Sequence, residues 1–416
     1  MKLDVIKATL ISCVLAASAM TDRAAAAQPP KDEQREFARQ FLRMCDLAAA
    51  ELQKPITPFA DRKSTDSTSH HMPFFEDGHA VRALGVAYDR TGDLKYLSAC
   101  QRWSDQMVAF QDRMIPAGAY FMNHGRAPGQ DHGPWNVADS GTIAMGVLAT
   151  AVRSAHRDPQ RRETYFRSVK AFAKLVMDNY VGPEGGITNG HWPGYAGQWW
   201  CSTATAGSFL LLLYEETGEE RYLRAGRAAL EWMVRQDFRE VKPITFQQRP
   251  SGIIFYCSEL YAIGLRHLTP DSPSRRLTQR QIAEAVAWMK EHPIKQVRFT
   301  STQEALVPPS SSAVKQMPGD WEHFDIHTDM AGLPYLKLIF ARELSQHQQL
   351  AITADEDLVR IARWLFSRGD PPISQLIPWE VMSWGMLSFA ERSSPGLLFR
   401  ASDRPIGQHP TIRRTP

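Results

Sequence analysis

Residues 84–97 read LGVAYDRTGDLKYL and residues 211–223 read LLLYEETGEERYL, so the chain contains two copies of one pattern. In each copy an apolar segment ends at a Thr-Gly pair, a short acidic turn follows, and an amphipathic segment with helical spacing begins. Weaker copies occupy residues 147–176, 262–289 and 338–365. Self-similarity of this kind indicates a repeated pair of antiparallel helices.

The two ends of the chain complete the series of helix pairs. We expect an opening helix at residues 33–52 and a closing apolar helix at residues 379–390, which brings the total to about six pairs. One helix of each pair is strongly apolar and the other is amphipathic. This predicts an all-α fold, an (α/α)6 toroid (six-hairpin barrel) whose apolar helices form the inner ring. We predict that the toroid spans residues 28–395 and that residues 396–416 form a poorly ordered tail.

The links between the predicted helices differ in length. Links from an inner to an outer helix take about 4 to 10 residues, whereas links back to the next inner helix take about 20 or more. The long links are residues 54–76, 113–138, 181–200, 237–256 and 293–328. Because they all lead to the beginning of an inner helix, we expect them at one rim of the toroid, where function concentrates.

The long links are rich in histidine, tryptophan and amide side chains. Aromatic faces beside polar groups suit a sugar ring, whose C–H faces stack on the rings while its hydroxyls take hydrogen bonds. We therefore predict an oligosaccharide substrate. The alternative for each aromatic side chain is that it packs its loop onto the toroid. The predicted substrate-binding residues are His71, Trp135, Asn189, His191, Trp192, Trp199, Trp200, Trp321 and His327.

Two aspartates occupy the first turns of predicted inner helices. Asp139 follows the loop in GPWNVADSGT (residues 133–142), and Asp77 has the same context about 60 residues earlier. The helix dipole and the free N–H groups of a first turn favour a carboxylate there. Asp139 and Asp77 are therefore the candidate catalytic residues. The alternative is that both only cap their helices.

These repeats and aspartates resemble those of the six-hairpin glycosidase superfamily. Within it, the chain is most similar to the unsaturated glucuronyl and rhamnogalacturonyl hydrolases, which use two aspartates one hairpin apart. The resemblance implies that Asp139 is the general acid on the vinyl ether of an unsaturated uronic acid and then the base for water, with Asp77 in support. Residues 197–207 lack the arginine found in the glucuronyl branch. A uronate would then be held by Arg126, Arg249 or His191, or its carboxylate would not be recognised at all.

Other functions use other residues of the same rim. A polysaccharide lyase would use Asn189, His191 and Tyr195. Ordinary glycoside hydrolysis would pair Asp139 with Glu259, Glu322 or Glu380. A non-catalytic glycan-binding toroid is a third alternative. Metal sites are minor alternatives, formed by Cys201, Cys257 and a histidine or by Asp325, His327 and Asp329. We predict no metal and no cofactor.

Composition and the N-terminus limit the partners and the compartment. The net charge of +3 comes from 48 basic and 45 acidic residues without a basic run, which argues against nucleic acid. Residues 1–27 have the charged, apolar and small-residue order of a signal peptide, so we expect a periplasmic or secreted monomer without a membrane span. In that compartment Cys45, Cys100, Cys201 and Cys257 form disulfides or remain as buried thiols.

Overall fold

The computed structural model describes residues 31–58, 66–124, 133–191, 197–236, 250–291, 331–367 and 369–399. The chain divides into two compact units, residues 1–36 and residues 37–416. The described part of the first unit is the beginning of helix α2 (Lys31–Glu51). All the features described below belong to the second unit.

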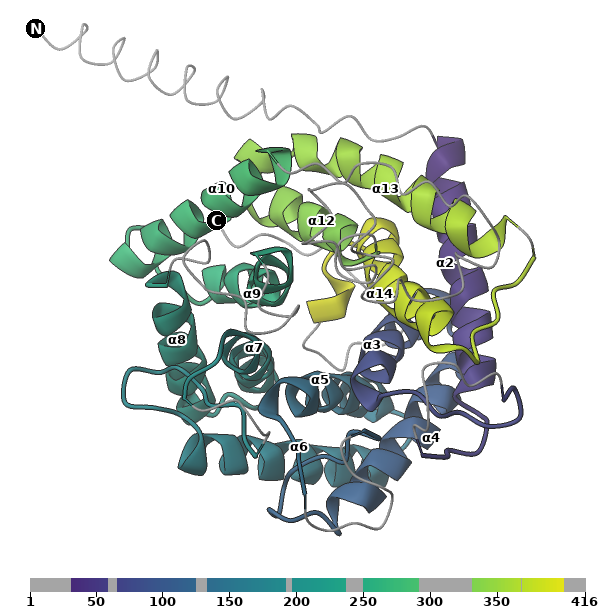
Figure 1. Cartoon of the computed structure of the whole chain (residues 1–416), viewed down its shortest axis with the longest axis horizontal. Helices are drawn as coiled ribbons and strands as arrows, with labels where there is room; N and C mark the ends of the chain where they lie inside the picture. Colours follow the sequence, from purple (N-terminus) through teal and green to yellow (C-terminus); the bar gives the residue numbers. More distant parts are fainter. Residues whose placement is uncertain are drawn as a thin grey trace, which may run out of the picture. The chain divides into compact units, whose positions relative to one another are not determined.

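Among the described residues of the second unit, six helices form an inner ring, which can be followed in Figure 1. Each packs against the next along the chain, and the last packs against the first. Their apolar residues explain this position: in α7, every residue from Trp200 to Leu213 is buried. The inner helices are α3 (Phe74–Thr91), α5 (Val137–Ser154), α7 (Trp200–Thr217), α9 (Pro250–Leu265), α12 (Leu333–Glu343) and α14 (Leu376–Ser393).

A second layer of helices surrounds the inner ring (Figure 1). These helices bury one face only, as in α8, where Tyr222, Leu230 and Met233 are buried while Arg224 and Glu231 are exposed. The outer helices are α2 from residue 37 onward, α4 (Leu94–Gln111), α6 (Pro159–Asn179), α8 (Glu220–Val234), α10 (Pro273–Glu291) and α13 (Gln349–Phe366). The predicted (α/α)6 toroid is confirmed. The described residues contain no β-strand, only isolated bridges such as that between Thr188 and Gln198.

The two Thr-Gly turns that predict the fold have the same geometry. Gly92 and Gly218 lie in the left-handed region with φ of 71° and 68°, and their N–H groups donate to the carbonyl oxygens of Tyr88 and Tyr214. A left-handed residue after the last helical turn favours glycine because it has no Cβ. The turn therefore ends α3 and α7, and in both cases the next outer helix begins two residues after the glycine.

The beginnings of the inner helices lie together at one end of the ring. Ala138, Cys201 and Tyr256, from the first turns of α5 and α7 and from α9, belong to one small apolar cluster. Close approach of the helices depends on small residues: a Cβ added to Gly78 in α3 would lie 2.8 Å from the carbonyl oxygen of Thr142 in α5. The described parts of three predicted long links, residues 54–76, 113–138 and 181–200, each lead into the beginning of an inner helix, while residues 237–249 and 293–328 lie outside the described residues.

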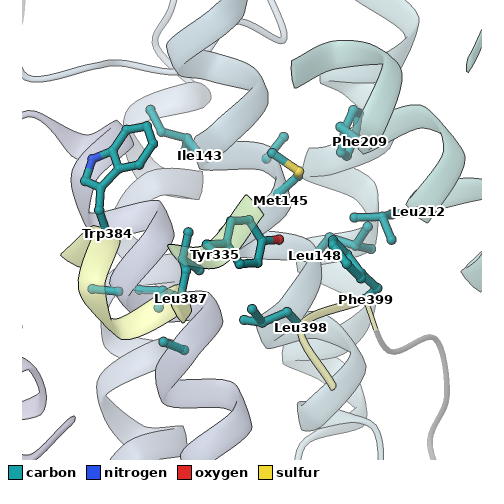
Figure 2. Packing of buried hydrophobic residues seen from close by; sticks show 14 of the residues in the cluster. Ile143, Met145, Leu148, Phe209, Leu212, Tyr335, Trp384, Leu387, Leu398 and Phe399 are labelled. Carbon is teal, nitrogen blue, oxygen red and sulfur yellow. The ribbon is translucent and has the colours of Figure 1, made fainter. Parts of the chain in front are cut away.

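The ordered fold extends beyond residue 395, where we predicted its end. The short 3₁₀ helix η5 (Leu397–Phe399) places Leu398 and Phe399 in the apolar core, in the same cluster as Leu148, Leu212 and Tyr335 (Figure 2). The guanidinium groups of Arg266 and Arg342 lie 5.6 and 5.0 Å from the centre of the Phe399 ring. Leu398 and Phe399 are thus buried although they fall within the predicted tail, because burial of large apolar side chains is favourable. Residues 400–416 lie outside the described residues.

No helix in the described ranges is both long enough and apolar enough to cross a bilayer. The cysteines of the described residues are free and buried: Cys45, Cys100, Cys201 and Cys257. Of the two expectations for them, disulfides or buried thiols, the structure agrees with buried thiols.

Candidate active site

Asp139 lies in the first turn of α5 and is held by two side chains of the preceding loop. The N-cap residue Asn136 accepts a hydrogen bond from the Asp139 backbone N–H at 2.7 Å, and its Nδ2 donates to Asp139 Oδ2 at 2.9 Å. His124 Nε2 lies 2.7 Å from the same Oδ2. This reciprocal cap fixes the direction of the carboxylate relative to the helix axis.

The two oxygens of Asp139 have different surroundings. Both side-chain partners contact Oδ2, and among the described residues no hydrogen bond to Oδ1 is formed. The Asp139 side chain is 15% exposed. Oδ2 is therefore anchored by two side chains, while Oδ1 accepts no hydrogen bond from the described residues.

A small apolar cluster connects the residue before Asp139 to the beginning of α7. Ala138, Trp199 and Cys201 form a small cluster, against which Tyr256 packs. Burial raises the pKa of the Cys201 thiol, and the charge of nearby Asp139 contributes to that rise. This thiol therefore stays neutral and serves as packing beside Asp139.

Asp77, the second predicted catalytic residue, has a different environment. Its side chain is fully buried. The indole N–H groups of Trp103 and Trp379 donate to it at 3.1 and 3.0 Å, and His70 Nε2 lies 2.9 Å from both carboxylate oxygens. Both oxygens are thus occupied by donors from three different segments of the chain.

His70 links Asp77 to a second buried carboxylate. Its Nδ1 lies 3.2 Å from Glu51 Oε1, at the end of α2. Burial by itself would lower the pKa of His70, but the charges and hydrogen bonds of Asp77 and Glu51 outweigh it and raise the pKa to about 9. His70 is therefore a buried imidazolium between two carboxylates at neutral pH.

The predicted aromatic residues occupy three kinds of position. Trp199 lies in the apolar cluster with Ala138 and Cys201. Trp135 is fully buried and packs edge-on against Tyr180 at 5.4 Å between ring centres. Trp200 is 7% exposed and packs edge-on against Trp232 of the outer helix α8 at 6.0 Å. Trp199 therefore shares a cluster with Ala138, the residue before Asp139, whereas the other two pack against the ring of Tyr180, which follows α6, and the ring of Trp232 in α8.

The predicted polar residues are also separated by the structure. Asn189 is buried and accepts a hydrogen bond from Ser202 Oγ at 2.6 Å, which fixes the loop to the first turn of α7. His191 is exposed, with its Nε2 3.3 Å from the Tyr180 hydroxyl. His71 is buried, and burial together with the charge of His70 lowers its pKa. Trp192, Trp321 and His327 lie outside the described residues.

The carboxylates predicted for the alternative functions are largely buried where the structure describes them. Glu259 is buried and paired with Arg82, whose Nη2 lies 2.7 Å from its Oε1, and it also accepts from the Tyr335 hydroxyl. Glu380 is 8% exposed. Within the described ranges, no group of three or more His, Cys, Asp or Glu side chains could hold a metal ion. Outside those ranges lie Arg126, Tyr195, Arg249, Glu322, Asp325 and Asp329.

Solved structures of the same architecture were found by comparison. A heparin-specific unsaturated glucuronyl hydrolase matches with a TM-score of 0.54 and 12% identity, over 88% of this chain and 98% of its own. Dfg5 from Chaetomium thermophilum, solved with glucosamine, matches with a TM-score of 0.57 and 11% identity, over 91% and 94%. The chain has the six-hairpin toroid fold of these proteins. The unsaturated glucuronyl hydrolase from Bacillus sp. GL1 shares this toroid with a TM-score of 0.52 and 16% identity, over 87% and 98%.

No protein-family model matches the sequence, and no curated protein is significantly similar to it. The likeness to the solved toroids therefore concerns the fold. The residues that hold Asp139 were not predicted as site residues. His124 and Asn136 lie in the long link that precedes Asp139. The N-cap position of Asn136, three residues before Asp139, is a local signal for Asn136, and His124 has none.

Proposed function

We propose that the protein is a glycoside hydrolase that acts on oligosaccharides ending in an unsaturated uronic acid, with Asp139 as its general acid and base. The observation that carries the proposal is the asymmetry of this carboxylate, with Oδ2 anchored by His124 and Asn136 and the side chain 15% exposed. The six-hairpin fold supports the glycosidase part. The uronyl part rests on the resemblance of the two aspartates to those of the unsaturated uronyl hydrolases.

The proposed reaction needs one group that first gives and then accepts a proton. Protonated Asp139 delivers its proton to C4 of the C4=C5 double bond, and the oxygen of a water molecule adds to C5. The proton lost by that water returns to the Asp139 carboxylate. The hemiketal formed at C5 opens to a ketone, which leaves a hemiacetal at C1 that releases the adjoining sugar. Asp139 ends the cycle protonated, as it began.

In this proposal Asp77 stabilises the fold around the site and does not contact the sugar. A fully buried carboxylate that accepts from Trp103, Trp379 and His70 has no exposed oxygen for a sugar hydroxyl. It holds the beginning of α3, which packs directly against α5 and hence supports the first turn that carries Asp139. Asp77 is therefore a positioning residue, and Trp199 is the aromatic residue proposed to contact substrate.

Ultraviolet absorbance of the conjugated double bond tests the proposal. The purified protein is incubated separately with unsaturated uronyl disaccharides, with intact polyuronates and with neutral oligosaccharides. We expect loss of absorbance with the disaccharides, which Asp139→Asn abolishes. A rise of absorbance with the polymers would instead identify a lyase. Release of reducing sugar from neutral substrates alone would identify an ordinary glycosidase, and sugar binding without turnover would identify a glycan-binding protein.

We further propose that residues 1–27 direct export and are removed, so that the mature protein works in the periplasm or outside the cell. The support is the order of charged, apolar and small residues in that segment. Mass spectrometry of the protein recovered from cell fractions tests this. A mature chain beginning at Gln28 outside the cytoplasm is expected, and an intact N-terminus in the cytoplasm would contradict it.

A further inference from the structure

The segment 122–124 connects the beginnings of two inner helices. The carbonyl oxygen of Met122 accepts a hydrogen bond at 3.0 Å from the N–H of Phe74, the first residue of α3. The Met122 sulfur lies 3.3 Å from the backbone nitrogen of Asn136, the N-cap of α5. This short piece of the loop between α4 and α5 is therefore attached to both helices that carry the predicted aspartates.

Asn123 gives the segment its shape. Its φ is 61°, in the left-handed region, and it is the one described residue other than glycine with a positive φ. Asparagine tolerates this conformation better than most residues. Its Nδ2 donates to the carbonyl oxygens of Thr57 at 3.1 Å and Met72 at 2.9 Å, and the side chain is buried. The loop before α3 thus holds an unusual backbone turn immediately before His124.

His124 emerges from this turn and reaches Asp139. Its Nε2 lies 2.7 Å from Asp139 Oδ2, and its ring lies edge-on to Phe75 of α3 at 6.0 Å between ring centres. Asn136 holds the same oxygen from the α5 side. Without His124, the carboxylate would keep one side-chain hydrogen bond and could turn more freely about its Cα–Cβ and Cβ–Cγ bonds.

We propose that Asn123 and His124 form a positioning latch that fixes Asp139 in the orientation in which Oδ1 faces the reacting sugar. This inference rests on the proposed role of Asp139. Asn123 binds the loop before α3, and the next residue, His124, binds the Asp139 carboxylate at the beginning of α5, so the loop fixes where the carboxylate lies. Small errors in the position of a proton-transferring group lower turnover more than they lower substrate binding.

Four variants test the latch by kinetics. His124→Ala removes the donor and is expected to lower kcat by about 10- to 100-fold with KM nearly unchanged. His124→Gln, whose side-chain nitrogen can occupy the place of Nε2, is expected to recover most of the loss. Asn123→Asp keeps the turn but cannot donate to the two carbonyl groups, so a smaller loss of kcat is expected. His156→Ala, in the short link after α5, is the matched control and should leave kcat unchanged.

Two kinetic results would contradict the proposed latch. Wild-type kcat in His124→Ala would do so, and so would an equal loss in His124→Ala and His124→Gln. Thermal unfolding of each variant shows whether the fold is retained, and the Gln variant provides the comparison if the Ala variant unfolds.

A spectroscopic readout separates this proposal from the proposed function. Nuclear magnetic resonance of protein labelled with ¹⁵N-histidine, with His124→Gln for assignment, reports the imidazole without any substrate. We expect the His124 ring signals to move in Asp139→Asn and the His156 signals to stay. If no substrate is turned over but the signals move, the contact stands and the proposed function fails. If wild type is active and the signals do not move, the latch fails and the function stands.

Discussion

The indole N–H of Trp379 donates to Asp77 Oδ1 at 3.0 Å, although the two residues lie 302 positions apart in the chain. Five residues later, the indole N–H of Trp384 donates to Glu76 Oε2 at 2.6 Å. The last inner helix, α14, is thus joined to the first, α3, through two adjacent carboxylates. The ring of helices is closed at the end where the proposed active site lies.

Removing one of these donors should weaken the closure. Trp379→Phe keeps an aromatic ring but leaves Asp77 with one donor fewer in a fully buried position, so we expect a loss of about 1–3 kcal/mol in the free energy of unfolding. Urea denaturation measures it. Trp135→Phe is the matched control, because Trp135 is equally buried and its Nε1 has no hydrogen-bond partner among the described residues. An equal loss in both variants would contradict the importance of the hydrogen bond.

The buried imidazolium of His70 predicts how stability depends on pH. Its pKa is raised from 6.5 to about 9 in the folded protein. The stabilisation is therefore complete below about pH 6.5 and is lost as the pH rises through about 9, and it amounts to on the order of 3 kcal/mol. The difference in unfolding free energy between wild type and His70→Gln should shrink over that interval. A difference that stays constant from pH 6 to pH 10 would show that His70 is not charged when folded.

The helix pairing was predictable from sequence because its determinants are local. The Thr-Gly turns and the contrast between apolar and amphipathic helices lie within single repeats, and Gly92 and Gly218 have the left-handed conformation that the pattern indicates. The position of Asp139 in a first turn followed from the same local signals. Such features need no knowledge of distant contacts.

The close crossing of α3 and α5 should not tolerate a side chain at residue 78. Gly78→Ala would bring the new Cβ to 2.8 Å from the Thr142 carbonyl oxygen, and because this neighbour is backbone, we expect a loss of about 1–3 kcal/mol. Gly385→Ala is the control, since its Cβ would meet the Ile361 side chain at 3.3 Å. Thermal unfolding compares the two. A melting temperature of Gly78→Ala at or above that of Gly385→Ala would contradict the account.

The C-terminal apolar residues should contribute substantially to stability. Phe399→Ala removes a ring that is 2% exposed and that both Arg266 and Arg342 approach with their guanidinium groups, so we expect a loss of about 3–5 kcal/mol. Leu397→Ala, at the partly buried start of η5, should cost less. Chemical denaturation of both variants measures the difference, and equal stability of Phe399→Ala and wild type would show that the residue does not belong to the core.

The surroundings of the two aspartates could not be predicted, because they depend on contacts between distant residues. Asp77 and Asp139 have similar sequence contexts, yet Trp379 encloses the first from the far end of the chain, while the donors of the second come from its own loop. Trp135 and Asn189 suit a sugar-binding rim by residue type. Their burial depends on Tyr180 and Ser202, which the sequence pattern does not connect with them.

The central claim is that Asp139 is the carboxylate that transfers the proton, and comparison of Asp139→Asn with Asp77→Asn on an unsaturated uronyl disaccharide tests it most directly. Each variant is assayed for turnover and for its free energy of unfolding. We predict that Asp139→Asn loses about 10²- to 10⁴-fold in kcat with little change in stability, and that Asp77→Asn chiefly loses stability. A folded Asp139→Asn variant that turns over the disaccharide within about tenfold of the wild-type rate would contradict the claim.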